Sequence, residues 1–147
     1  MYWGYNWSWG LPLLVLTVVF HVSMFVLMEK ALLSPTNGVR RLRRLARFII
    51  PIALVGLGAA TLHGVEAVAW AALYVWVGAM SDPSTAILYS LSAITSYGHS
   101  EVFLQDRWKL LGAIEAMDGL ILFGLTTAFL FAAIERVRSS PQASRGA

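Results

Sequence analysis

Besides Glu29 and Lys30 near the end of the first of them, five acidic or histidine residues lie inside long apolar stretches of this sequence, and their types and spacing make them the first candidates for chemistry. They are His21, His63, Glu66, Glu115 and Asp118. His63 and Glu66 are three positions apart, so on a helix they share one face and can form a pair. Glu115 and Asp118 have the same spacing. An ionisable group at membrane depth is unfavourable, and it is therefore a functional candidate by default.

Two kinds of role are open for these residues. His63 with Glu66 can brace a neighbouring helix, and Glu115 with Asp118 can support a loop from behind. Alternatively, His21, His63 and Glu66 could ligate a metal ion or a haem in a small membrane subunit. The sequence has no cysteine, no H-E-x-x-H spacing, no Gly-rich phosphate loop and no nucleophile elbow. We therefore expect no enzyme and no resident cofactor, and the sequence identifies no partner for His21.

The composition indicates which elements must position these residues. The chain has 147 residues, of which 58% are hydrophobic and 13% are charged, whereas about a quarter of the residues in soluble domains are charged. A helix that crosses a bilayer core needs about 20 predominantly apolar residues. Three stretches have this length: Leu11 to Leu33, about Phe48 to Met80, and about Leu110 to Ile134. The sequence thus predicts an all-α membrane protein with three transmembrane helices.

The basic residues predict the orientation of these spans. Arginines gather after the first and third stretches: Arg40, Arg41, Arg43, Arg44, Arg47, Arg136 and Arg138. Because basic residues stay on the cytoplasmic side, residues 34–47 and the C-terminus are expected in the cytoplasm, with the N-terminus outside. An aromatic belt at the outer interface is predicted for Trp3, Tyr5, Trp7 and Trp9. Beyond orientation, the arginines suit contact with anionic membrane lipids rather than with nucleic acid.

One face of the second stretch carries small residues. Gly56, Ala60 and Gly64 recur every four positions, so on a helix they share a face. Small side chains allow another helix to approach closely. The sequence therefore predicts a helix–helix contact along this face.

The connection between the second and third spans has the pattern of a re-entrant loop. Asp82 can cap a helix, Pro83 suits its first position, and Ser84–Thr95 then predicts a helix of about twelve residues. That helix is too short to span, and a polar segment follows it before the chain returns to Trp108. Non-helical backbone persists at membrane depth only where protein buries it or where it lines a watery path. One chain with three spans cannot enclose such a path, so we expect an oligomer.

The order of span, short helix, loop and span resembles that of small bacterial members of the tetrameric potassium channel family. The most specific likeness is to the family pattern W-R-L-L-G-x-x-E-x-x-x-G-x-L-L-F-G-x-S-T-A-F-L-F, which this chain follows at Trp108–Gly112, Glu115, Gly119 and Phe123–Phe131. Further residues resemble the pore helix and the outer helix of the family: Leu88–Leu91, His63, Glu66, Ala69–Ala71 and Tyr74. The resemblance covers roughly residues 60–134. It implies a homotetramer whose chain adds a peripheral N-terminal span to a two-helix pore domain.

The resemblance also implies that one polar segment forms the ion-conducting filter: Thr95, Ser96, Tyr97, Gly98, His99, Ser100 and Glu101. Against the family's T-x-G-Y-G-D, His99 replaces the tyrosine and Ser100 replaces the second glycine. A potassium filter replaces the ion's hydration shell with backbone carbonyls, and serine is disfavoured at the positive φ angles that glycine adopts freely. The resemblance makes potassium the favoured ion and sodium the second candidate, but these replacements make the filter degenerate and predict weakened selectivity for potassium. A non-selective or proton-modulated cation channel is the alternative. His99 is either a pH-sensitive group at the entrance or a solvated loop histidine.

The third span supplies the predicted inner pore. Gly119 and Gly124 either let this helix bend at a gate or let another element pack closely. Thr126 and Thr127 either line the inner cavity or bond back to their own helix. His63, Glu66, Glu115 and Asp118 are expected to support the filter.

The predicted organisation has three parts. Residues 1–47 form a peripheral transmembrane helix with a basic cytoplasmic loop, residues 48–138 form the pore domain, and residues 139–147 form a disordered tail. The predicted function is passive transport of monovalent cations across a bacterial inner membrane.

Overall fold

The computed structural model describes residues 3–33, 44–98 and 102–139. His99, Ser100 and Glu101 of the predicted filter lie outside the described residues. The same holds for residues 34–43, which include three of the arginines, and for residues 140–147 of the predicted tail. The side chains of Arg44, Arg47 and Arg138 are also outside the description.

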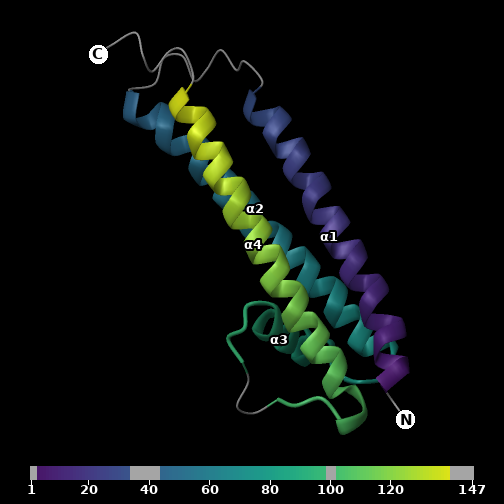
Figure 1. The fold of residues 1–147 in the computed structure, drawn as a ribbon. Coiled ribbons are helices and arrows are strands. Elements are labelled where there is room, and N and C mark those ends of the chain that lie inside the picture. Colours follow the sequence, from purple (N-terminus) through teal and green to yellow (C-terminus); the bar gives the residue numbers. More distant parts are fainter. Residues whose placement is uncertain (1–2, 34–43, 99–101, 140–147) are drawn as a thin grey trace.

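The described chain consists of three long helices and one short helix. They are α1 (Trp3–Leu33), α2 (Arg44–Trp76), α3 (Pro83–Ile94) and α4 (Lys109–Ser139), with a 3-10 turn at Asp106–Trp108 ahead of α4. All regular structure in the described residues is helical, and α1, α2 and α4 are each long and apolar enough to cross a membrane. This confirms the predicted all-α fold with three candidate spans. Figure 1 shows that α1 and α4 begin, and α2 ends, at the end of the bundle where α3 lies, which we call the α3 end.

Helix α1 runs beside α4 in the same direction. Near the α3 end, the Asn6 side chain donates to the carbonyl oxygen of Arg107 (2.8 Å) and accepts from the backbone N–H of Leu111 (3.0 Å). At the opposite end, Glu29 of α1 pairs with Arg136 of α4. Helix α1 therefore begins at Trp3 rather than at the predicted Leu11, because the aromatic residues expected in a tail form its first turns and Asn6 holds them against α4.

Helix α2 ends at Trp76, four residues before the predicted boundary at Met80. Gly78 adopts a φ of 69°, in the left-handed region that favours glycine and commonly ends helices. The backbone N–H groups of Ala79 (2.8 Å) and Met80 (3.2 Å) both donate to the carbonyl oxygen of Tyr74. The chain therefore folds back onto the last turn of α2 before α3 begins.

The capping residues predicted from the sequence start α3. Asp82 is its N-cap and accepts from the backbone N–H (2.7 Å) and the hydroxyl (2.6 Å) of Thr85, with Pro83 at the first helical position. These hydrogen bonds lower the pKa of Asp82 below its ordinary value because they favour the ionised carboxylate. The helix has 12 residues, so it is about 18 Å long, well short of a bilayer core of about 30 Å.

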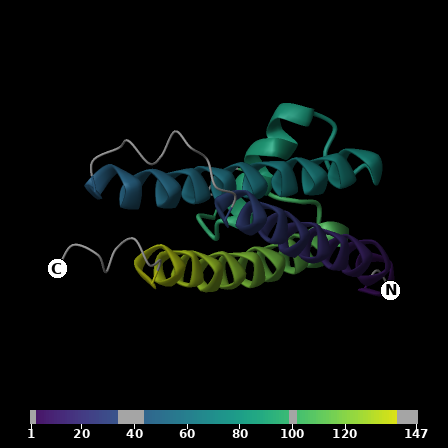
Figure 2. The same cartoon turned by 90° about the horizontal axis from the view of Figure 1, so that it is seen from above.

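Helix α3 packs between α2 and α4 and leaves one side uncovered. Its buried residues are Ala86, Ser90, Ser92 and Ile94. Three apolar residues of this helix, Ile87, Leu88 and Leu91, are exposed. Figure 2 shows α3 lying outside the layer formed by the long helices. The core under it contains Trp70 and Tyr74 of α2 together with Leu111, Ile114 and Leu122 of α4.

The small-residue face of α2 does not meet another helix in the described chain. A Cβ atom at Gly56 or Gly64 would have no neighbour within 4 Å, and Ala60 is exposed. The close approach inside the chain occurs at Gly58, where a Cβ atom would overlap Met28 of α1. The predicted contact along Gly56, Ala60 and Gly64 is thus not made within one subunit, because the interior face of α2 carries Val55, Ala59 and Leu62.

Candidate functional site

The carboxyl end of α3 reaches well into the length of the long helices. A Cβ atom at Gly119 would overlap the backbone carbonyl of Ile94, so glycine is needed for this approach. Gly119 lies in the third turn of α4, about 15 Å along the helix from Lys109. On the other flank, the hydroxyl of Ser90 lies 2.7 Å from the carbonyl oxygen of Ala67. Ala67 is about 14 Å along α2 from its end at Trp76. The contacts of α3 with α2 and with α4 therefore lie at similar distances from the α3 end.

Glu115 joins α3 to the two helices that flank it. Its side chain is fully buried and accepts from the hydroxyl of Tyr74 on α2 and from the hydroxyl of Ser90 on α3. Buried polar atoms in proteins are almost always paired, and one carboxylate here pairs with donors from two other helices. Of the four predicted filter-support residues, Glu115 is the one with a hydrogen bond to α3 in the described structure.

Asp118 holds the long helices together instead. Its Oδ2 atom accepts from the hydroxyl of Thr17 on α1 (2.7 Å) and from the indole N–H of Trp70 on α2 (2.8 Å). Its Oδ1 atom is buried without a hydrogen-bond partner in the described structure. Asp118 therefore acts between the spans and not directly behind the filter segment.

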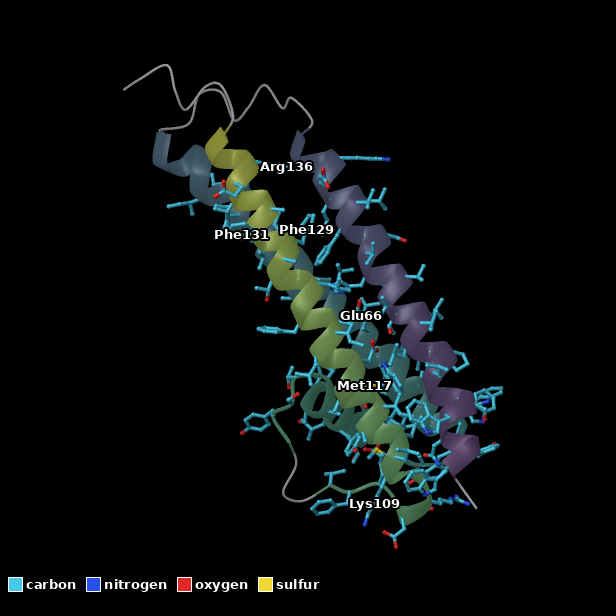
Figure 3. The ribbon with its side chains drawn as sticks, viewed as in Figure 1. Glu66, Lys109, Met117, Phe129, Phe131 and Arg136 are labelled. Carbon is cyan, nitrogen blue, oxygen red and sulfur yellow. The ribbon has the colours of Figure 1, made fainter. Side chains whose placement is uncertain are left out.

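Four polar side chains from three helices meet beyond Asp118, toward the end opposite α3. We call His21, Glu66, His63 and Thr126 the buried tetrad. The Nδ1 atom of His21 lies 2.7 Å from Oε1 of Glu66, and its Nε2 atom lies 3.0 Å from the hydroxyl of Thr126. The Nε2 atom of His63 lies 3.2 Å from the same hydroxyl. Figure 3 shows Glu66 in the interior between α1 and α4.

The tetrad supplies the partner for His21 that the sequence did not reveal, and it gives α1 a buried polar contact with both other spans. It also changes the interpretation of Thr126. This residue was one of the two predicted cavity-lining threonines, but its hydroxyl is buried against two histidines. Thr127 is exposed and its hydroxyl donates to the carbonyl oxygen of Phe123 (2.9 Å), the alternative that the sequence left open.

The predicted metal-binding alternative does not match this arrangement. In the part of the chain that the structure describes, no group of three His, Asp or Glu side chains has a geometry that could hold a metal ion. The nitrogen atoms of the two histidines are directed at Glu66 and at Thr126 rather than at a common point.

The described part of the filter segment, residues 95–98, leaves α3 through two left-handed residues. Thr95 caps the helix, Ser96 has a φ of 55° and Gly98 has a φ of 80°. The backbone N–H of Gly98 donates to the carbonyl oxygen of Ser92 (3.3 Å). The side chain of Tyr97 is 87% exposed. The sequence predicts backbone strain at Ser100, which replaces a glycine of the family pattern. Among the described residues, the serine with a left-handed φ is Ser96.

The two predicted gate glycines differ in surroundings. Gly119 is fixed against α3, whereas a Cβ atom at Gly124 would have no neighbour within 4 Å. Gly124 belongs to an exposed face of α4, with Met117, Leu120, Thr127 and Phe131.

Figure 3 shows Phe131 on the side of α4 away from α1, and Phe129 on the side toward it. Phe129 stacks on Phe25 of α1, with ring centroids 4.2 Å apart.

No family model matches this sequence, and no curated protein or solved structure matches it either. The fold and site define an all-helical membrane protein with three candidate spans, a short helix wedged between two of them, and a line of buried polar groups that joins all four helices.

Proposed function

We propose that this protein is a homotetrameric channel that passes monovalent cations passively across a bacterial inner membrane. Helix α3 is the re-entrant pore helix, the segment from Thr95 to Glu101 is the ion path, and the exposed face of α4 lines the inner pore. The N-terminus and the α3 end face outward, and the C-terminus lies in the cytoplasm. Potassium is the favoured ion and sodium the second candidate.

The observation that carries this proposal is the depth of α3. Its carboxyl end contacts Gly119 about 15 Å inside the length of α4, and the non-helical residues 95–98 follow at that level. Backbone of this kind persists at membrane depth only beside protein or water. A helix of this length also directs partial negative charge from its carboxyl end, which favours a cation there.

Oligomerisation follows from the uncovered side of α3. Ile87, Leu88 and Leu91 are exposed, as is Tyr97 beyond the helix, so one chain does not enclose residues 95–98. Sister subunits supply the missing wall. Four copies is the number implied by the resemblance to tetrameric potassium channels. The small-residue face of α2 is a second surface on which a sister helix can pack, because a Cβ atom at Gly56 or Gly64 would have no neighbour within 4 Å.

A non-selective cation pore is the second candidate. It is favoured by the 87% exposure of the Tyr97 side chain, because this side chain does not pack against the described chain to stiffen the segment. Ser100, which stands where the family pattern has glycine, points to the same outcome.

Current through the purified protein in a planar bilayer tests the proposed function. With potassium on one side and sodium on the other, we expect a cation current whose reversal potential lies toward the potassium equilibrium potential. The double variant His99→Tyr with Ser100→Gly should move the reversal potential further in that direction. A wild-type reversal potential near zero would select the non-selective pore. Absence of current for both cations, with folded protein in the bilayer, would contradict the channel.

A further inference from the structure

The four groups of the buried tetrad are arranged in a cycle. Three of its links are hydrogen-bond distances: Glu66 Oε1 to His21 Nδ1 (2.7 Å), His21 Nε2 to Thr126 Oγ1 (3.0 Å), and Thr126 Oγ1 to His63 Nε2 (3.2 Å). The fourth runs from His63 Nδ1 back to Glu66 Oε2 and is longer, at 3.5 Å. Glu66 Oε2 is also a buried oxygen without a hydrogen-bond partner in the described structure.

With Glu66 ionised and both histidines neutral, the cycle has one hydrogen too few for its four links. Each of the four links needs one hydrogen. A neutral imidazole carries one N–H and a hydroxyl carries one O–H, so His21, His63 and Thr126 supply three, and an ionised Glu66 supplies none. One link must then join two acceptors, and the long approach of His63 Nδ1 to Glu66 Oε2 is the open link. One added proton closes it and brings the net charge of the tetrad from minus one to zero.

We propose that the tetrad is a proton-binding site that holds one proton between His63 and Glu66. The proton lies either on Nδ1 of His63 or on the carboxyl of Glu66, and both forms satisfy every link of the cycle. This inference does not depend on the ion path proposed above, because the tetrad joins α1, α2 and α4 whether or not the protein conducts. The ligand of the tetrad is the proton itself, and binding of this proton neutralises a buried charge.

One side of the tetrad is partly exposed, and aromatic rings cover another side. His21 and Glu66 are almost completely buried, whereas the side chain of His63 is 23% exposed, so His63 is the tetrad histidine nearest the surface of the chain. The stacked rings of Phe25 and Phe129 lie on the side away from α3, and Phe25 also packs against His21.

The other ionisable groups near the tetrad lie toward the α3 end. Asp118 of α4 interacts electrostatically with both Glu66 and His21. Beyond it, Glu115 of α4 faces Tyr74 of α2 and interacts with Tyr89 of α3.

Loss of the proton at high pH should loosen the contact of α1 with α2 and α4. The ionised carboxylate then faces an unprotonated nitrogen of His63, and a buried charge is left uncompensated. The folded chain then lacks the proton that the tetrad holds, so stability decreases as the pH rises through the titration of the tetrad. Toward low pH the unfolded chain binds protons on both histidines and on Glu66, whereas the tetrad holds one, so stability decreases there too and is greatest in between.

Infrared spectroscopy and thermal unfolding of the purified full-length protein, over a range of pH, test the proposal. In the difference between the wild-type and Glu66→Gln spectra, which removes the bands of the buried carboxyl groups Glu115 and Asp118, we expect one band to disappear as the pH rises. It is the carbonyl band of a protonated Glu66 or the ring band of a protonated His63, and the unfolding temperature should decrease in parallel. Glu66→Gln should have a flatter stability profile, because the amide supplies the missing hydrogen without charge. Glu29→Gln, a change at a half-buried glutamate that pairs with Arg136 near the opposite end of the bundle, and Asp118→Asn should keep the band.

A matched pair of variants tests the cycle itself. Thr126→Val opens two links and should shift the disappearance of the band to lower pH, whereas Thr127→Val, at the neighbouring exposed hydroxyl, should leave it in place. A titrating band and stability profile that persist unchanged in Glu66→Gln would overturn the proposal. If Glu66→Gln does not fold, an unchanged titration in Thr126→Val would overturn it equally.

Discussion

Gly119→Ala is expected to detach the carboxyl end of α3 from α4 and to abolish conduction. An added Cβ atom would overlap the backbone carbonyl of Ile94, which is part of a helix and cannot turn aside as a flexible side chain would. Overpacking of this kind costs about 3 kcal/mol where the backbone must move. The unfolding temperature in detergent should decrease, and cation flux into liposomes should fall to background.

Gly124→Ala is the matched control for this change. It makes the same substitution on the same helix, five positions further on, where a Cβ atom would have no neighbour within 4 Å. Stability should be unchanged or slightly higher, since alanine favours a helix over glycine. If the unfolding temperature decreases equally in the two variants, the close contact between α3 and α4 does not account for the effect of Gly119→Ala.

The second large effect is expected at Glu115. Glu115→Leu removes the acceptor for the Tyr74 hydroxyl and leaves this donor buried without a partner, at a cost of about 1–3 kcal/mol. The Ser90 hydroxyl keeps the carbonyl oxygen of Ala67 as an acceptor, but α3 loses its side-chain link to α4. We expect a lower unfolding temperature and a loss of most of the cation flux.

A double variant separates the hydrogen bond from a general disturbance of packing. Tyr74→Phe combined with Glu115→Leu removes donor and acceptor together, so no buried hydroxyl is orphaned at position 74. Stability should recover relative to Glu115→Leu alone. A double variant whose loss of stability equals the sum of the two single losses would show that Tyr74 and Glu115 are not coupled.

Local signals in the sequence predicted the elements well. The spans follow from long apolar stretches, and α3 follows from Asp82 and Pro83, whose capping roles depend only on neighbouring residues. The exact ends were less predictable. Helix α2 ends at Trp76 because the backbone turns at Gly78, and the apolar residues that continue to Met80 conceal this turn.

Contacts between distant helices could not be predicted in the same way. A helix that is apolar on all sides does not encode which side faces its neighbour, so the partners of His21 and the burial of Thr126 emerge only in the fold. The same limit explains the small residues of α2. Gly56 and Gly64 form the more regular pattern, yet Gly58 makes the close contact with α1.

Disulfide trapping of Tyr97→Cys tests the central claim most directly, namely that residues 95–98 of several subunits converge on one axis. The natural chain has no cysteine, so this variant carries a single thiol. A disulfide forms where Cα atoms come within about 4.4–6.8 Å. Leu16→Cys, at a position on α1 that is 63% exposed, is the control. In oxidised native membranes we predict covalent dimers and reduced cation flux for Tyr97→Cys, and neither for Leu16→Cys. Monomeric Tyr97→Cys protein with unchanged flux would contradict the account.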